Sequence, residues 1–463
     1  MPDLRLNRRH CLALLGSSGL PATVLAAPLP AAPALVAPAG AVQLPPLPLR
    51  ERRLANGLQV VSVPSALSSS VSVQVWYRVG GKDDPAGRSG FAHLFEHMMF
   101  KRTRYMPNEM FDRLTEDVGG QNNAFTAEDM TAYQNEVPSN HLERLLWAEA
   151  ERLAHLQVDQ ANFDSERKVV IEELRQRVLA DPYGRLFNAM PQYGFEQHPY
   201  RRPVIGNEAE LNAATLDDVQ RFHSTYYRPD NALLIVAGDF DPPQLDAWVD
   251  RYFGRLVTPS TPIPRVTTVE LPRAQDGRAT LHAPTVPLPA VALLWKAPPA
   301  RHADAAALTV ASALLSGGES SRLNEALVYR AQAAQGAGSS ADLYADAGLF
   351  TAYAIAAHGQ PLAKLESLLL AQIRQLATGA IAPAELDKVR TQLLTAALAS
   401  RQTPQGQAQA IGQAVLLHGD ARAADRDLQR LQAVSAADVQ AALQRWVLGS
   451  KRMTVQYSQG AGA

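Results

Sequence analysis

Two segments of this sequence, 220 residues apart, match each other and indicate that the chain contains two related halves. The first, LNAATLDDVQRFHSTYYRPDNALLIVAG, begins at Leu211, and the second, LQAVSAADVQAALQRWVLGSKRMTVQYS, begins at Leu431. In both, a hydroxyl residue that can cap a helix, Thr215 or Ser435, precedes a helical pattern, and a strand pattern follows. The ungapped alignment has identical residues at Leu211/Leu431, Ala213/Ala433, Asp218/Asp438, Val219/Val439 and Gln220/Gln440. We therefore predict an α+β fold made of two related domains from an internal duplication, each a mixed sheet with helices.

The expected boundaries follow from changes in composition along the chain. We expect the two domains at residues 46–256 and 278–463, joined by a Pro/Thr-rich linker at 257–277. In the first domain, SVSVQVWYRVG from Ser70 alternates like a half-buried strand, and a helix is expected at about residues 88–101.

The first 45 residues have the pattern of a signal peptide followed by a Pro/Ala-rich leader. Arg8 and Arg9 precede a moderately apolar run, and small residues suited to cleavage follow it. The paired arginines favour the twin-arginine route, although Cys11 stands where that signal usually has a large apolar residue, and ordinary secretion is the alternative. No later apolar run is long enough to cross a bilayer. We expect a periplasmic protein with no integral membrane segment in the mature chain.

Charge and cysteine content exclude several classes of function. Lys+Arg 44 against Asp+Glu 45 leaves a net charge of −1, so nothing in the overall charge predicts nucleic acid as a partner. Cys11 is the only cysteine, which excludes a disulfide framework and a site of several thiolates within the chain. Any metal must therefore be held by His, Asp and Glu.

The stretch GFAHLFEHMMF, residues 90–100, has the spacing of a catalytic metal site. Four residues is slightly more than one helical turn, so His93 and His97 can direct two imidazoles at one ion. Glu96 lies beside that face and has the length to take a proton from water and pass it to a leaving amine. An accidental HxxEH in this chain has a probability on the order of one percent. The motif predicts metal-assisted peptide hydrolysis.

A third ligand is expected on the helix-like run FDSERKVVIEELRQRV. A catalytic zinc usually takes three protein ligands and leaves one position for water. Glu166 and Glu173 are two turns apart and share a face, whereas Glu172 points about 100° away from Glu173. Spacing therefore favours the pair Glu166 and Glu173, without choosing between them.

HxxEH, then GGQNNAFTAEDMTAY, then ERKVVIEEL resemble, in this order, the inverzincin peptidases grouped with pitrilysin and insulin-degrading enzyme. The half-length branch that includes mitochondrial processing peptidase is especially similar. The resemblance implies that Glu173 completes the zinc site with His93 and His97, that Glu96 is the catalytic base, and that Glu166 supports the site. It also implies duplicated domains around a chamber that admits unfolded peptides. Only the first domain has the histidine pair, so one Zn²⁺ per chain is expected.

The resemblance also assigns a role to NNAFT. In the family this is an edge strand to which an extended substrate adds its backbone hydrogen bonds. An ordinary edge strand is the alternative. The substrate-binding candidates are Asn122, Asn123, Ala124, Phe125 and Thr126.

The chain departs from the family pattern in its second domain. Active relatives carry an arginine there and, seven residues later, a tyrosine, which together hold the substrate and polarise its carbonyl. Val328 and Gln335 align with those positions and can do neither, while Tyr329 and Arg330 lie nearby. We predict a zinc endopeptidase subunit that forms a heterodimer with a homologous subunit supplying the Arg/Tyr pair.

Two other functions fit the sequence less well. One is a non-catalytic core or assembly subunit of a larger complex with the same fold; such proteins have typically lost parts of HxxEH, which this chain retains. The other is a binding module with a structural zinc, which three ligands and a neighbouring glutamate do not favour.

Overall fold

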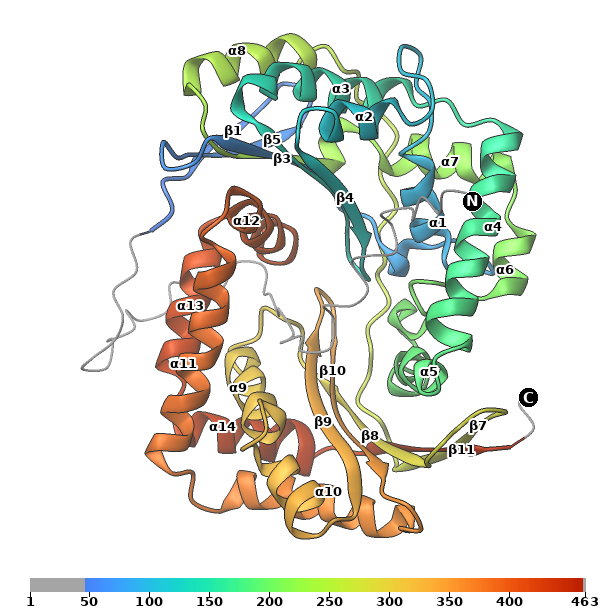
Figure 1. Ribbon diagram of the computed structural model, residues 1–463, viewed down its shortest axis with the longest axis vertical. Helices are drawn as coiled ribbons and strands as arrows, with labels where there is room; N and C mark the ends of the chain where they lie inside the picture. The colour runs from blue at the N-terminus through green and yellow to red at the C-terminus, as the bar shows by residue number, and fades with distance from the viewer. Residues whose placement is uncertain (1–45, 461–463) are drawn as a thin grey trace, which may run out of the picture.

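Two mixed sheets with the same strand order form the framework of the protein (Figure 1). The computed structural model describes residues 46–460, and the predicted leader at 1–45 lies outside them. The first sheet has the order β1 (Arg50–Arg53), β2 (Gln59–Pro64), β6 (Ala232–Gly238), β3 (Ser70–Tyr77), β5 (Thr131–Pro138), β4 (Gln121–Thr126). The second has the order β7 (Gly277–Ala283), β11 (Arg452–Gln459), β8 (Ala290–Ala297), β10 (Gly348–Ala356), β9 (Ala334–Leu343). The predicted α+β fold of two related domains is confirmed.

Fourteen α-helices in the described residues cover these sheets. Those of the first half are α1 (Phe91–Met98), α2 (Met110–Glu116), α3 (Leu142–His155), α4 (Gln160–Leu174), α5 (Gly184–Gly194), α6 (Glu208–Ala213), α7 (Leu216–Tyr226) and α8 (Pro242–Tyr252). Those of the second are α9 (Ala305–Ser316), α10 (Leu362–Thr378), α11 (Pro383–Ser400), α12 (Pro404–His418), α13 (Ala423–Ala433) and α14 (Ala436–Leu443). None of the helices within residues 46–460 is long and apolar enough to span a membrane.

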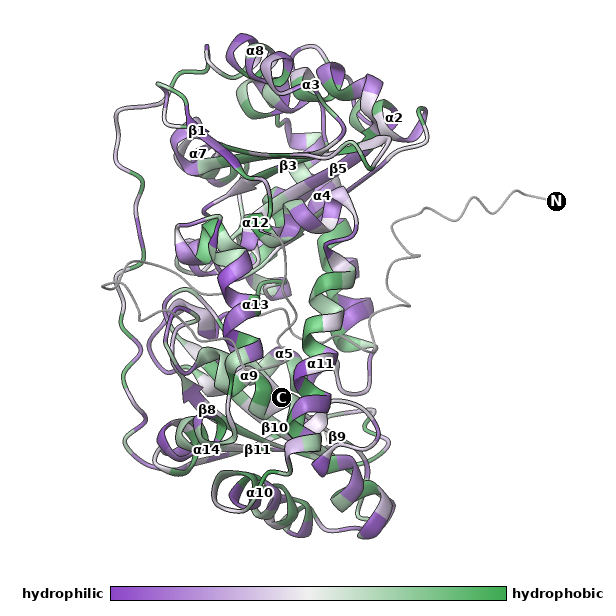
Figure 2. Ribbon diagram, turned by 90° about the vertical axis from the view of Figure 1, so that its left-hand side faces the viewer, coloured by the Kyte–Doolittle hydropathy of each residue, from purple (hydrophilic) through white to green (hydrophobic). Residues whose placement is uncertain are grey.

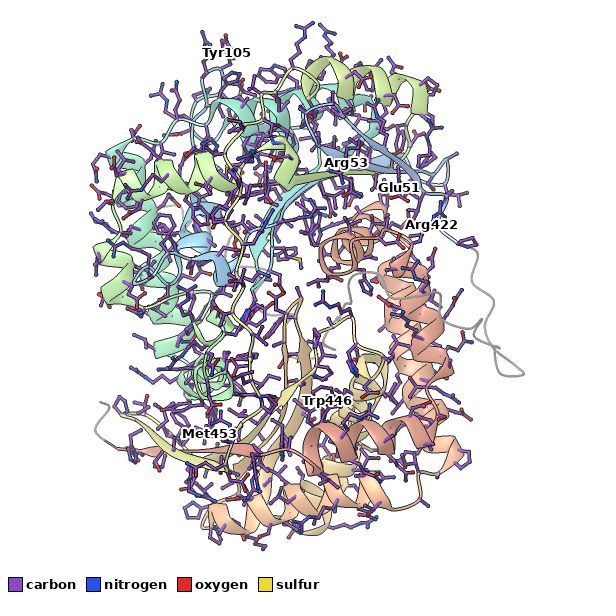
Figure 3. All side chains as sticks on the ribbon, turned by 180° about the vertical axis from the view of Figure 1, so that it is seen from behind. Glu51, Arg53, Tyr105, Arg422, Trp446 and Met453 are labelled. Carbon is purple, nitrogen blue, oxygen red and sulfur yellow. The ribbon has the colours of Figure 1, made fainter. Side chains whose placement is uncertain are left out.

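The offset of 220 residues seen in the sequence holds for several elements of the structure. β3 and β8 start at residues 70 and 290, α7 and α14 at 216 and 436, and β6 and β11 at 232 and 452. Thr215 and Ser435 each form a capping box, with Asp218 and Asp438 respectively. The aromatic residue near the end of each repeat packs in its own core; Trp446 also donates a hydrogen bond to Asp304 (2.8 Å; Figure 3). The repeats are therefore structural as well as sequence repeats.

The central strand β3 differs from its prediction, because both of its faces are buried. Val73 and Val75 point into the core formed with the first-half helices, as the alternation predicts. Ser72 and Gln74, on the other face, are also buried, and Gln74 donates a hydrogen bond to the Gln405 carbonyl oxygen (3.0 Å). The expectation of a half-buried strand is wrong because a helix from the other half of the chain covers the polar face.

Each half contributes one helix to the other half's sheet. α12 packs on the first sheet through Ile411 and Val415, and it lies beside that sheet in both views (Figures 1 and 2). Reciprocally, α5 packs on the second sheet through Leu186 and Met190. Both helices are buried against sheets about 220 residues away in sequence, so each half stabilises the other.

The segment between the halves has no helix or strand, but it is held at defined points. Glu270 accepts hydrogen bonds from the backbone N–H groups of residues 196, 197 and 198 (2.7–3.0 Å) and pairs with Lys296 (2.5 Å). Arg265 donates to Asn231 (2.6 Å) and to the Arg78 carbonyl oxygen (2.9 Å). These bonds fix the connecting segment to both halves.

The contact between α12 and the first sheet gives a test of this mutual dependence. A Cβ atom at Gly412 would lie 2.2 Å from the buried Trp76 ring, whereas one at Gly336 would meet nothing within 4 Å. Gly412→Val should therefore lower the free energy of unfolding by about 1–3 kcal/mol through overpacking. Gly336→Val is the matched control and should be nearly neutral. Urea denaturation measures both, and equal midpoints would contradict this packing.

Candidate metal centre

The helix that carries the histidines begins at a position fixed by a buried aspartate. Asp84 accepts hydrogen bonds from the backbone N–H groups of Gly90 (2.8 Å) and Ala92 (2.7 Å), at the start of α1. Gly90 has φ 84, and a Cβ there would lie 2.7 Å from the Ile205 carbonyl oxygen, so this close turn requires glycine. Burial raises the pKa of Asp84 to about 7, although these N–H groups oppose the rise. The role of Asp84 was not predicted from the sequence.

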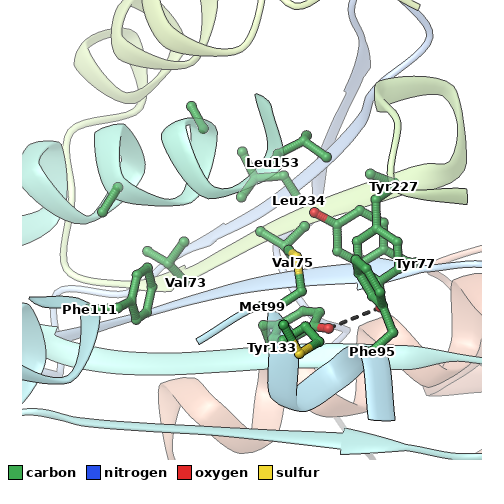
Figure 4. Packing of buried hydrophobic residues seen from close by; sticks show 14 of the residues in the cluster. Val73, Val75, Tyr77, Phe95, Met99, Phe111, Tyr133, Leu153, Tyr227 and Leu234 are labelled. Carbon is green, nitrogen blue, oxygen red and sulfur yellow. Dashed lines mark hydrogen bonds between the residues drawn. The ribbon is translucent and has the colours of Figure 1, made fainter. Parts of the chain in front are cut away.

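Aromatic packing holds the inner face of α1. Phe95 contacts Tyr227, with ring centroids 4.3 Å apart, and Tyr227 in turn lies 4.3 Å from Tyr77. The hydroxyl groups of Tyr133 and Tyr227 are hydrogen-bonded (3.0 Å; Figure 4). This cluster fixes the rotation of α1 about its axis and thereby the directions of His93 and His97.

Three side chains meet with the separations that a tetrahedral zinc requires. The Nε2 atoms of His93 and His97 lie 3.6 and 3.5 Å from the same oxygen of Glu173, Oε2. Ligands about 2.0–2.1 Å from a tetrahedral zinc lie about 3.3–3.4 Å from one another. Within residues 46–460, no other group of His, Cys, Asp or Glu side chains has this arrangement. The residues present therefore fit zinc.

The ionisation of these groups follows from burial and mutual contact. Burial lowers the pKa of His93 to about 4, which keeps its imidazole neutral and able to ligate. For His97, burial opposes protonation, but hydrogen bonds with Glu166 and Glu173 outweigh it and raise the pKa to about 9. Burial would raise the pKa of Glu173, yet the bond with His97 and the charges of His93 and Arg177 lower it to about 2. Metal binding should therefore release a proton from His97.

Two cations hold the carboxylates that face the histidines. Glu166, almost fully buried, faces His97 Nδ1 at 3.4 Å and pairs with Lys101 Nζ at 2.5 Å. Arg177, on the π-helical segment η4 (Arg175–Leu179) that continues α4, lies 2.5 Å from Glu173 Oε1. The pairing leaves Glu173 Oε2 facing the two histidines. Lys101 and Arg177 were not predicted, although each follows its neighbouring ligand by the four-residue spacing of a helical turn.

The structure separates Glu173 from the adjacent Glu172. Glu172 is exposed and accepts a hydrogen bond from Gln176 (3.0 Å), away from the histidines. In the second half, the positions 220 residues after Glu166 and Glu173 are Leu386 and Leu393, which belong to the hydrophobic core. α9, which takes the place of α1, contains no histidine. The second half lacks the chemistry of the first.

Glu96 and the predicted substrate strand are in direct contact. Thr126 Oγ1 donates a hydrogen bond to Glu96 Oε2 at 2.6 Å. Burial raises the pKa of Glu96, although His97 and the Thr126 bond oppose this. Within residues 46–460, Thr126 is the hydrogen-bond partner recorded for this carboxylate, and Oε1 is left to face other groups.

The other residues of the NNAFT run lie on β4, at the end of the first sheet, where β5 is the only neighbouring strand of the described chain. Asn122 donates to Thr115 Oγ1 (2.8 Å), and Phe125 packs edge-on against Trp76, with centroids 5.3 Å apart. Asn123 Oδ1 accepts the Ala124 N–H (2.9 Å). Most of these side chains thus have partners within the chain, and β4 offers its outer backbone edge.

The second-half residues considered as substitutes for the Arg/Tyr pair are all engaged locally. Arg330 pairs with Glu325 (2.8 Å), and Tyr329 donates to Glu319 (2.5 Å). Arg322 and Tyr329 are also seven residues apart, but Arg322 donates to both oxygens of Glu385 (2.7 and 2.8 Å). Val328 packs partly against the second core, and Gln335 is exposed.

Comparison with known families and proteins gives consistent matches over most of the chain. Residues 59–208 match the family described as insulinase (peptidase family M16), and residues 213–393 match the peptidase M16 inactive domain. The zinc protease PqqE of Helicobacter pylori is 35% identical over 73% of this chain and 76% of that protein. A probable mitochondrial-processing peptidase subunit beta of Arabidopsis thaliana is 23% identical over 86% of this chain and 76% of that protein. The crystal structure of a protease from Helicobacter pylori has a TM-score of 0.85 and 29% identity, and covers 89% of this chain and 100% of that one.

The contrast between the adjacent glutamates gives a test of the metal centre. Glu173→Gln removes the carboxylate charge opposite the two histidines, so zinc content should fall from about one per chain toward zero after dialysis. Glu172→Gln changes an exposed side chain on the same turn and should keep the metal. Inductively coupled plasma mass spectrometry measures both. Retention of zinc by both variants would show that the third ligand lies elsewhere.

Proposed function

This chain belongs to the insulinase family of peptidases, M16, and on that premise we propose that it is a zinc endopeptidase subunit that cleaves unfolded peptides. The observation that carries the proposal is the convergence of His93 Nε2, His97 Nε2 and Glu173 Oε2, with Glu96 on the same helix as the histidines. The relatives named as zinc proteases support the same class of chemistry.

Each residue of the site has a role that its position supports. His93, His97 and Glu173 would hold one Zn²⁺ per chain, and Glu166, through His97 Nδ1, would orient that imidazole. Zinc bound there supplies Lewis acidity, which polarises a carbonyl group and makes water more acidic. Glu96 is the general base: Oε2 is held by Thr126, and Oε1 takes the proton of the attacking water and then delivers it to the leaving amine. The burial of Glu96 raises its pKa and makes that proton easier to carry.

The edge of β4 is the proposed site for the substrate backbone. β4 bonds with β5 on one side, and its other side is the end of the sheet. An extended peptide that adds there would run beside Asn122–Thr126 and approach Glu96 at the Thr126 end. Recognition through backbone groups suits unfolded chains, because a folded protein seldom presents an unpaired strand. We propose peptides as substrates for this reason.

A homologous partner subunit is the second part of the proposal. The chain carries one metal centre, and Val328 and Gln335 stand where active relatives have the Arg/Tyr pair. The nearby Arg322, Tyr329 and Arg330 are held by acidic neighbours in the same half. The similarity to a processing peptidase subunit supports a heterodimer, whose second member would enclose the chamber and supply the missing pair.

We also propose that the protein is exported to the periplasm through the twin-arginine route. The proposal rests on Arg8, Arg9 and the apolar run that follows them. That route carries folded cargo, which suits a protein whose two halves each complete the other's packing.

The general base is tested by Glu96→Gln. Peptide hydrolysis should fall by at least about 10²-fold, because the amide cannot take the proton of water. Zinc content should remain near that of the wild type, since the substitution leaves the ligands intact. A fluorogenic peptide assay measures turnover, and Glu172→Gln should keep both activity and zinc. Full turnover by Glu96→Gln would refute its role as base.

The heterodimer is tested by comparing the zinc-loaded chain alone with the chain mixed with its homologous subunit. The partner should raise peptide turnover by about 10²- to 10³-fold, the usual effect of supplying one oxyanion donor. A partner in which the arginine and tyrosine are replaced should still bind, by light scattering, but should not activate. Full activity of the isolated chain, unchanged by the partner, would contradict the proposal.

A further inference from the structure

We propose that Thr126 is a positioning residue: its hydroxyl fixes the Glu96 carboxylate and ties its orientation to the end of strand β4. This inference rests on the proposed function, since Glu96 must act as the base for its orientation to matter. It gives Thr126 a role different from direct contact with substrate, which the family resemblance predicts.

The hydrogen-bond geometry assigns the single hydroxyl hydrogen of Thr126. Its Oγ1 lies 2.6 Å from Glu96 Oε2 and 3.5 Å from Thr131 Oγ1. Thr131 donates its own hydrogen to the Val79 carbonyl oxygen (3.0 Å), so it can only accept from Thr126. A carboxylate is the stronger acceptor and is also much closer. Thr126 therefore donates to Glu96.

The Glu96 carboxylate needs such a partner. α1 fixes the backbone of Glu96, but the last side-chain torsion of a glutamate is broad and sets the direction of both oxygens only weakly. Thr126 is β-branched and lies in a strand, so few χ1 rotamers are open to it. One bond from a stiff donor to Oε2 thus selects one orientation and leaves Oε1 for water.

The same residue connects the base to the substrate strand. Thr126 is the last residue of β4, where it pairs in register with Thr131 of β5. Phe125, its neighbour, points to the opposite face and packs on Trp76, whose indole N–H is bonded to Gln74 (2.9 Å). This end of β4 is therefore anchored on both faces. A peptide that pairs with β4 steadies the strand whose last side chain orients the base.

The test compares Thr126→Val with Thr126→Ser. Valine keeps the branched shape and removes the donor, so kcat should fall about 10- to 100-fold, as loss of a hydrogen bond to a charged group predicts. KM should change by less than about threefold, because contacts with the peptide are kept. Serine restores the hydroxyl and should recover kcat to within about threefold of the wild type. Zinc content and zinc affinity, from chelator competition, should be the same in all three proteins.

The assay uses the zinc-loaded chain together with its homologous subunit, and circular dichroism confirms folding. Thr126→Ala is the second donor-free variant, should valine disturb the strand, and it should show the same loss of kcat. A raised KM with unchanged kcat would overturn the inference in favour of direct substrate contact. Equal losses in the valine and serine variants would overturn it in favour of a structural role. A wild-type protein without zinc-dependent hydrolysis would overturn the peptidase proposal itself, and this inference with it.

Discussion

The exchange of one helix between the halves is the constraint on which the rest of the structure depends. α12 buries the polar face of β3, and α5 buries one face of the second sheet. α5 follows directly from α4 and η4, which carry Glu173 and Arg177, and Tyr457 of the second half donates to the Pro182 carbonyl oxygen just before α5 (2.8 Å). The helix that presents the third ligand is thereby fixed at one end by the other half of the chain. The proposed metal centre lies within the first half, but its geometry relies on both.

The acidic and basic groups around the histidines are arranged in opposed pairs. Lys101 balances Glu166 behind His97, and Arg177 balances Glu173 in front of it. An unpaired carboxylate as buried as Glu166 would be protonated, because burial disfavours its charge. The paired cations keep both carboxylates charged, and charged carboxylates orient imidazoles and bind divalent metal. In the second half the corresponding positions are leucines, which turn the same helix face into ordinary core. Duplication thus produced one half suited to chemistry and one suited to packing.

The proposed catalytic residues have different distances to their supports in sequence. Glu96 is next to His97, its partner Thr126 is 30 residues on, and Glu173 is a further 47 residues on. Sheet pairing of β4 with β5 and the packing of α1 and α4 bring these segments together. An Arg/Tyr pair supplied by another subunit would extend the same principle across an interface: the metal, the base and the oxyanion donors would come from separate, rigid elements. Such a division would couple hydrolysis to assembly.

The duplication, the two-domain α+β fold and the candidate ligands could all be predicted from the sequence, because they depend on local periodicity. Four residues place His93 and His97 on one helix face, and seven residues place Glu166 and Glu173 on another. Contacts between distant elements follow no such period. The sequence could not indicate that α12 covers Ser72 and Gln74, that Asp84 caps α1, or that Thr126 turns inward to Glu96. Periodicity sets the directions of side chains within one element, whereas only the packing of elements decides what those side chains meet.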